Sequence, residues 1–406
     1  MSELRPLPIS ILRGGTSRGI FFLAKDLPRD RARIEPILRD VFGSPDMRQI
    51  NGLGGATSNT SKAAIIGPPT RPDADIDYTF AQVSIGTPLI DWGGNCGNIS
   101  SAVGPFAVDA GLVPAVEGTT VVRIHNTNTG KIIVAHVPVQ GGRAARHGDY
   151  AIAGVPGTGA RVDLEFTEPA GSITGKLLPT GKATDEIRLA DGPVVRVSVV
   201  DAANPMAFAL AEDLGVRGDE SPAEIEANTG LTGALEEIRG IVAEWIGVVP
   251  DRAMALSQSP GLPKVGMVAA PSEYRASGGG TIGADSMDLL ARSMSMQTAH
   301  RSYQVTGAIC TAAASLIAGT TVHLVTRPAE RRAEPSRIRI GNPYGVMDAA
   351  VVSSTGSDGA LNIESVTIGR TARHILDGTV WISAELLAGE ETARGDSEVE
   401  VLATLA

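Results

Sequence analysis

The most constraining feature of this 406-residue chain is that its second half repeats motifs of its first half in the same order. Three pairs of segments correspond: 61–68 with 263–271, 95–102 with 306–313, and 123–126 with 339–342. The first pair opens on a lysine and continues as a short apolar strand, the second leads into small-residue helices, and the third lies in apolar–polar alternation typical of strands. The repeat predicts a duplicated α+β unit.

Turn and helix signals support the same division. Residues 189–193, Leu-Ala-Asp-Gly-Pro, form a turn-favouring cluster ahead of a predicted strand at 194–200. Each half also carries an amphipathic helical stretch before its lysine strand, over 29–41 and over 224–245. We therefore place the boundary between the two halves near residue 190.

Length and composition agree with two domains. A chain of 406 residues exceeds the size at which one hydrophobic core usually stops growing, and 43% hydrophobic residues can fill two cores. We expect domain 1–190 to carry the reactive residues and domain 191–406 to complete a cleft between them, since small-molecule pockets are common at domain interfaces.

Charge and residue usage exclude several classes of partner. A net charge of −10, without a basic stripe interleaved with aromatics, argues against nucleic acid. The longest mainly apolar stretch, 311–325, is shorter than a bilayer span of about 20 residues and predicts a buried helix running into a strand, so no membrane partner is expected. Residues 1–25 lack the segment order of a signal peptide, which predicts a cytoplasmic protein.

The cysteines and histidines argue against a metal site. Two cysteines cannot form a disulfide framework, and the six histidines show no His-x-x-x-His spacing. No structural or catalytic zinc is therefore expected.

The most reactive position indicated by the sequence is Cys96, which lies between Asn95 and Gly97 on a tight loop ahead of a helix. The first backbone N–H groups of a helix and the positive end of its dipole favour a thiolate or a bound carboxylate at that point. Lys62 opens the first lysine strand, 34 positions earlier. We predict that this lysine and this cysteine form the reactive pair.

Motifs throughout the chain resemble one known family. The segments that carry the resemblance are 12–19, 52–62, 82–85, 91–98, 102–107, Asp201 with 204–205, His300 with 306–308, and 341–343. They are similar to the PrpF-like family of 2-methylaconitate cis-trans isomerases, within the diaminopimelate-epimerase-like superfamily. The resemblance covers most of the chain.

The resemblance implies two similar domains, each a curled, mainly antiparallel sheet around a central helix, with a cofactor-free active site in the cleft between them. It also implies that Lys62 and Cys96 are the catalytic pair. Epimerases of the wider superfamily use one cysteine from each half, whereas the internal overlay places Gly307 opposite Cys96. Amino-acid racemisation is therefore not expected, and Cys310, one turn further on, is predicted to be a buried structural residue.

Around this pair a set of residues is predicted to bind the substrate, most of them loop donors, helix-mouth residues or charged groups, with Met296 expected to pack in the pocket wall. They are Thr16, Ser17, Arg18, Asn95, Gly97, Asn98, Asn204, Met296, His300, Arg301, Thr306, Gly307 and Ala308. Lys264 is expected to be the structural counterpart of Lys62.

Such a site suits isomerisation of an unsaturated di- or tricarboxylate by allylic proton transfer. A base removes a proton made acidic through a conjugated carboxylate, preorganised donors stabilise the dienolate, and an acid returns the proton. We expect 2-methylaconitate cis-trans isomerisation, with 4-oxalomesaconate tautomerisation, a 3-methylitaconate-type delta-isomerisation and a non-catalytic accessory role to an aconitase-like hydratase as alternatives. The resemblance implies a polycarboxylate as the partner and is compatible with a homodimer as the assembly.

Overall fold

The computed structural model describes residues 3–327, 335–357, 359 and 361–387. The first half contains β1 (Leu4–Gly14), β2 (Ser17–Leu23), α1 (Arg31–Phe42), β3 (Lys62–Gly67), β4 (Ile76–Val83), β5 (Ile90–Asp91), α2 (Gly97–Asp109), β6 (Gly118–Asn126), β7 (Lys131–Gln140), β8 (Arg143–Ala144), β9 (Val162–Thr167) and β10 (Asp185–Arg188). The second contains β11 (Val194–Ala202), β12 (Asn204–Leu210), α3 (Pro222–Ala227), α4 (Thr229–Trp245), α5 (Ala255–Gln258), β13 (Lys264–Ala269), β14 (Tyr274–Arg275), β15 (Thr281–Ile282), β16 (Leu289–Ser295), β17 (Thr298–Ala299), α6 (Val305–Leu316), α7 (Thr321–Val325), β18 (Ser336–Asn342), β19 (Gly345–Thr355), β20 (Leu361–Arg370), β21 (Ala372–Ser383) and α8 (Ala384–Leu387).

Strand pairing repeats along the chain. In the first half β2–β3 and β4–β6 are parallel, while β3–β4, β6–β7 and β7–β9 are antiparallel. In the second half β12–β13 and β16–β18 are parallel, while β13–β16, β18–β19 and β19–β20 are antiparallel. The order of parallel and antiparallel neighbours is thus the same in the two halves.

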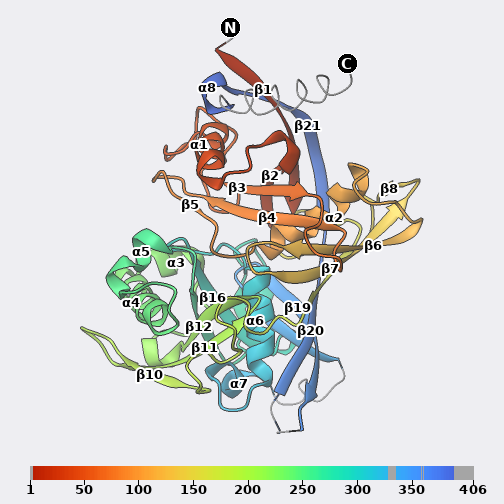
Figure 1. Cartoon of the computed structure of the whole chain (residues 1–406). Helices are drawn as coiled ribbons and strands as arrows, with labels where there is room; N and C mark the ends of the chain where they lie inside the picture. The colour runs from red at the N-terminus through yellow and green to blue at the C-terminus, as the bar shows by residue number, and fades with distance from the viewer. Residues whose placement is uncertain (1–2, 328–334, 358, 360, 388–406) are drawn as a thin grey trace, which may run out of the picture.

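The two series join into one hydrogen-bonded sheet. Among the described residues it has nineteen strands, and β9 pairs with β20 where the two series meet. Two strands cross the boundary drawn near residue 190: β10 pairs with β11, and β21 returns from the end of the chain to pair along β1. Figure 1 shows the long blue β21 running up to the red β1.

A central helix lies inside each series. Helix α2 packs against β1, β2, β3, β6, β7, β8, β9 and β21, and α6 packs against β11, β12, β18, β19 and β20. Every residue of α2 from Gly97 to Val108, and of α6 from Val305 to Ser315, is buried. Helices surrounded by sheet have no water-facing side, which explains why both sequences are almost uniformly apolar or small.

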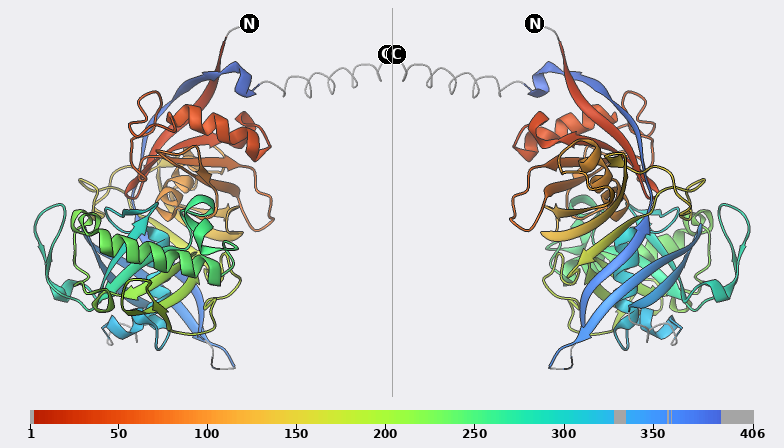
Figure 2. Two further views of the ribbon diagram at one scale, coloured as in Figure 1. Left: turned by 90° about the vertical axis from the view of Figure 1, so that its left-hand side faces the viewer. Right: turned by 90° about the vertical axis from the view of Figure 1, so that its right-hand side faces the viewer.

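Two amphipathic helices cover the outer sheet faces. Helix α1 buries Ile37, Leu38 and Phe42 against the strands of the first half, and α4 buries Leu235 and Ile238 against those of the second. Figure 2 shows α1 and α4 on the outside of the red-orange and green parts of the molecule. Helix α1 begins and ends within two residues of the predicted stretch 29–41. The predicted stretch 224–245 is instead two helices, α3 and α4, because Asn228 ends the first and its side chain caps the second by accepting from Leu231 N–H.

The expectation for residues 311–325 is wrong in its second half. Helix α6 ends at Leu316, and a second helix, α7, follows in place of a strand. The side chain of Thr320 accepts a hydrogen bond from the backbone N–H of His323 and so caps α7. None of the described helices is both long and apolar enough to cross a bilayer.

Candidate active site

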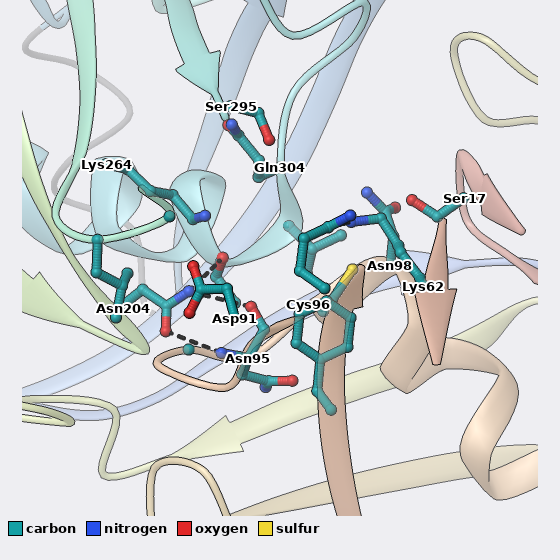
Figure 3. A pocket seen from close by; sticks show the side chains of 18 of the residues that line it. Ser17, Lys62, Asp91, Asn95, Cys96, Asn98, Asn204, Lys264, Ser295 and Gln304 are labelled. Atoms are coloured by element: carbon teal, nitrogen blue, oxygen red, sulfur yellow. Dashed lines mark hydrogen bonds between the residues drawn. The ribbon is translucent and has the colours of Figure 1, made fainter. Parts of the chain in front are cut away.

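One cavity takes residues from both series of strands. It encloses about 570 Å³ of empty space, including its open mouth. Its lining holds Ser17, Lys62, Phe80, Gln82, Asp91, Gly94, Asn95, Cys96, Gly97, Asn98, Asn204, Gly261, Leu262, Lys264, Ser295, Met296, His300, Gln304, Val305 and Thr306. Figure 3 shows the side chains of Lys62, Cys96, Lys264 and Asn204 around it.

Lys62 is held at the start of β3 by the neighbouring strand. It pairs directly with Gln82 on β4, and its ammonium donates a 2.5 Å hydrogen bond to the Gln82 side-chain oxygen. The Gln82 amide nitrogen donates in turn to the carbonyl of Ser61, at 2.9 Å. The Phe80 ring, on the same strand face as Gln82, lies 5.3 Å from the Lys62 nitrogen. The lysine side chain is only 8% exposed, so its position is tightly restricted.

Cys96 is the residue that precedes the first turn of α2. Its backbone is extended, with φ −113° and ψ 94°, its side chain makes no capping hydrogen bond, and its carbonyl accepts from Ser100 N–H. The first N–H groups of the helix therefore lack a side-chain cap and lie at the cavity, beside a partly exposed thiol. This is the anion-favouring position that the sequence predicts.

Helix α6 faces the same cavity from the second half. Gln304 precedes its first turn and, like Cys96, makes no capping bond there. Its side chain instead accepts from Ser293 Oγ at 2.5 Å and donates to the carbonyl of Met294 at 3.0 Å. The position equivalent to Cys96 is therefore Gln304, and the expected equivalence with Gly307 is wrong by three residues. The second half still provides no thiol at this position.

The mouths of α2 and α6 touch each other. A Cβ atom added to Gly97 would lie 2.5 Å from Val305 Cγ1 and 2.7 Å from Val305 Cβ, closer than real side chains approach. Glycine at 97 therefore lets the two helix N-termini meet at one cavity. Two uncapped N-termini together form a site for anionic groups.

This contact predicts the effect of a small substitution. Gly97→Ala should push the helix mouths apart and lower kcat/KM for the isomerisation expected from the sequence by about ten- to hundredfold, because small displacements of reacting groups cost that much. Adding Val305→Gly removes the colliding atoms and should recover most of the loss. Steady-state kinetics of the two variants test this, and wild-type kcat/KM in Gly97→Ala would contradict the contact.

Asn204 ties the halves together at the edge of the cavity. Its side-chain nitrogen donates to the Asn95 carbonyl at 3.0 Å and to Thr306 Oγ at 3.2 Å, while its oxygen accepts from Asn95 N–H at 3.2 Å. These bonds fix the loop that carries Cys96 to β12 and α6. The geometry gives Asn204 a positioning role and leaves its amide little capacity for a ligand.

His300 lines the cavity as a neutral ring. Burial, with the nearby Lys62 ammonium as a second cause, lowers the pKa of His300 to about 3. Its Nδ1 accepts from Ser302 N–H at 3.2 Å, which leaves Nε2 as the N–H donor. Ser17 is also buried, and its hydroxyl has no hydrogen-bond partner among the described residues, so it can bind a ligand atom in the cavity.

Met296 and Asn98 shape the wall of the cavity. Met296 sits in the left-handed region at φ 52° in the turn between β16 and β17. Asn98 Oδ1 accepts from Thr16 N–H at 3.3 Å, which fixes the turn between β1 and β2 to α2.

Five predicted site residues lie outside this lining. Thr16 and Arg301 border a neighbouring cavity that shares Met296, and Arg301 pairs with Glu226 at 3.1 Å. Arg18 turns toward the carbonyl of Leu53, at 3.4 Å. Gly307 and Ala308 are buried in the first turn of α6. The geometry therefore gives no support for contact of these five residues with a ligand in the main cavity.

The sequence prediction missed several lining residues. Gln82 and Phe80 come from β4, which pairs with the strand of Lys62, and Asp91 comes from β5, which pairs with β4. In the second half Ser295 ends β16 and Gln304 precedes α6. The signal that could have identified Gln82 is its cross-strand pairing with Lys62, which requires the strand register. Within the described parts of the chain, no three His, Cys, Asp or Glu side chains gather in a way that could hold a metal ion.

Comparison with known proteins gives the family. The sequence model of the PrpF protein family matches residues 5–383. The 3-methylitaconate isomerase of Eubacterium barkeri is 45% identical over 94% of this chain and 98% of that protein. The 2-methyl-aconitate isomerase of Cupriavidus necator is 37% identical over 93% of this chain and 98% of that protein. The 4-oxalomesaconate tautomerase of Pseudomonas putida is 37% identical over 95% of this chain and 98% of that protein.

Solved structures agree. The crystal structure of a methylitaconate-delta-isomerase, 45% identical, superposes with a TM-score of 0.76 and covers 96% of this chain and 98% of its own. A hydroxyproline epimerase from Agrobacterium vitis, 13% identical, has a TM-score of 0.53 over 94% of each chain, which shows a shared fold alone. The chain therefore belongs to the PrpF family, the family of isomerases that its sequence motifs indicate.

Proposed function

We propose that this protein isomerises an unsaturated methyl-substituted di- or tricarboxylate by allylic proton transfer between Lys62 and Cys96. The observation that carries the proposal is that both side chains enter one cavity, at the mouths of two uncapped helices. One of the pair removes a proton and the other returns one, as general acid–base catalysis requires. The helix N–H groups and the Ser17 hydroxyl stabilise the charge that develops on the substrate carboxylate.

For 3-methylitaconate the chemistry is a 1,3-proton shift. The base takes the proton from the methyl-bearing carbon. The electron pair then delocalises into the carboxylate on that same carbon and, through the exocyclic double bond, onto the methylene carbon. The acid then protonates the methylene carbon, which becomes a methyl group as the double bond moves between the two central carbons. For 2-methylaconitate, the proton returns to the carbon that lost it after rotation within the same type of dienolate.

Relatives favour the first of these substrates. The 3-methylitaconate isomerase is 45% identical to this chain, while the 2-methyl-aconitate isomerase and the 4-oxalomesaconate tautomerase are each 37% identical. We therefore put 3-methylitaconate ahead of 2-methylaconitate, which the sequence motifs alone favoured. The repeated strand pairing also supports a division into 1–190 and 191–406, with β21 of the second part pairing back onto β1 of the first.

Proton exchange in D₂O tests the proposal. Purified protein is incubated separately with 3-methylitaconate, 2-methylaconitate and 4-oxalomesaconate, and ¹H NMR follows deuterium incorporation and product formation. We expect deuterium in the methyl group of the 3-methylitaconate product, and faster turnover of this acid than of the other two. Absence of exchange with all three acids would contradict isomerase chemistry at this site.

A further inference from the structure

Lys264 occupies the position in the second half that Lys62 occupies in the first. Lys62 is the first residue of β3 and pairs with Gly19 of the parallel strand β2. Lys264 is the first residue of β13 and pairs with Met206 of the parallel strand β12. The repeat therefore directs two lysines from related positions into one cavity.

The partners of these lysines differ. Gln82 opposite Lys62 accepts its hydrogen bond. In the second half β13 pairs with β16 from Gly266 opposite Ser293, and this register continued by two residues places Ser295 opposite Lys264. A serine side chain is too short to replace the glutamine. Within the part of the chain that the structure describes, no hydrogen bond or ion pair holds the Lys264 ammonium, although the residue lines the cavity. The cavity thus contains one lysine fixed by the protein and one whose donors are available to a ligand.

The surroundings explain why such a cation needs an anionic partner. Burial and then the Lys62 ammonium lower the pKa of Lys264 to about 8, while Cys96 and Asp91 oppose that shift. The Asp91 carboxylate accepts from Gly93 N–H at 2.8 Å and attracts the Lys264 ammonium without forming a direct ion pair with it. A bound carboxylate would satisfy the ammonium and restore its ordinary preference for the charged form.

We infer that Lys264 anchors the substrate carboxylate remote from the proton-transfer pair, together with the N–H groups at the mouth of α6, and so makes this a site for diacids. The inference rests on the proposed function and deepens it. Arg18 and Arg301 point elsewhere, so they do not compete for this role. Lys264 then acts as a specificity-determining residue, because an acid that lacks the second carboxylate leaves its ammonium unpaired.

The experiment compares a diacid with its amides. Kinetics of 3-methylitaconate and of each of its two monoamides are measured with the wild type, with Lys264→Met, and with Lys25→Met as an exposed-lysine control. For the diacid, Lys264→Met should raise KM about ten- to hundredfold, as loss of a charged hydrogen bond would, with kcat changed less than about threefold. For the monoamide that lacks the carboxylate bound by Lys264, the KM values of the wild type and of Lys264→Met should agree within about twofold. The charged pair between Lys264 and that carboxylate is then absent in both enzymes.

The other possible outcomes distinguish a failure of the anchoring role from a failure of the proposed function. An unchanged KM for the diacid in Lys264→Met, or an equal rise for the diacid and both monoamides, would overturn the anchoring role while the proposed isomerase activity stood. A large loss of kcat at constant KM would also overturn it and move Lys264 to the reacting centre. Lack of turnover by the wild type with every acid would instead contradict the proposed function.

A second variant, Lys264→Arg, tests the anchoring role through the pH dependence of kcat/KM, which a purely structural role of Lys264 would leave unchanged. Lys264 carries its charge below a pKa of about 8 and loses it above, so wild-type kcat/KM should fall as the pH rises through 8. Lys264→Arg should keep binding the diacid and lose this part of the fall, because an arginine stays charged. Other titratable groups face the same cavity in both enzymes, namely Lys62, Cys96, Asp91 and His300. The effect of Lys264 is therefore the difference between the pH profiles of the wild type and Lys264→Arg. Superimposable profiles would contradict the assignment.

Discussion

Replacing Lys62 with methionine should lower kcat for 3-methylitaconate at least a hundredfold and leave the fold intact. General acid–base groups contribute about 10²- to 10⁴-fold, and methionine keeps the length of the side chain without its exchangeable protons. The loss should appear equally in isomerisation and in deuterium exchange, because both require the same proton transfer. Steady-state kinetics and ¹H NMR in D₂O measure the two quantities.

Structural damage must be distinguished from lost chemistry in this variant. Lys62 is buried and bonded to Gln82, so its removal leaves the Gln82 side-chain oxygen without that donor. Circular dichroism and thermal unfolding should show a folded protein, and binding of the unreactive diacid succinate should persist if Lys264 anchors one carboxylate. Activity within tenfold of wild type would remove Lys62 from the catalytic pair.

Replacing Cys96 with alanine or serine should have an effect of similar size, at least a hundredfold on kcat. Serine keeps a hydroxyl at the same position, but its proton is far harder to remove than that of a thiol, so it should not substitute in proton transfer. The side chain makes no capping bond to α2, so neither change should unfold the helix. Comparable losses in the Lys62 and Cys96 variants, without further loss when they are combined, would show that the two act as a unit.

Cys310 provides the matched control. It is fully buried in α6, its thiol donates to the Val200 carbonyl at 3.2 Å, and burial raises its pKa well above the ordinary range. Cys310→Ala should change kcat less than about twofold. Iodoacetamide should label Cys96 in the native protein and spare Cys310. A Cys310→Ala enzyme as inactive as Cys96→Ala would contradict the assignment of the reactive thiol.

The repeat and the placement of Lys62 and Cys96 could be predicted from the sequence for a clear physical reason. A lysine at the start of an apolar strand and a cysteine ahead of a small-residue helix are local patterns, and each survives in the structure as β3 and as the residue before α2. The alignment of the second helix fails because Gly, Ala and Thr match at several offsets, and neither Cys96 nor Gln304 makes a capping bond that would mark the helix start. Capping also determines the secondary structure of the second part of 311–325. Thr320 caps and so starts α7, where apolar composition alone favours a strand.

The parts of the site that the sequence analysis missed depend on how strands distant in the sequence pair. Gln82 joins the site because β4 pairs with β3 in one register, and Lys264 joins it because β13 repeats the placement of β3. Neither fact is visible in local composition. Arg18 and Arg301 carry the right charge for a carboxylate, but their partners, the Leu53 carbonyl and Glu226, are set by folding and direct them elsewhere.

Because β9 pairs with β20, the entropic cost of ordering the site arises when the chain folds and not when the substrate binds. Six residue pairs, from Ser365 with Thr167 to Arg370 with Val162, join the two strand series by a backbone ladder. A ladder of this kind cannot swing as a flexible linker does, so the distance between the two lysines is set when the chain folds. The substrate therefore meets an electrostatic frame whose ordering is already complete, and its binding energy remains available for stabilising the dienolate.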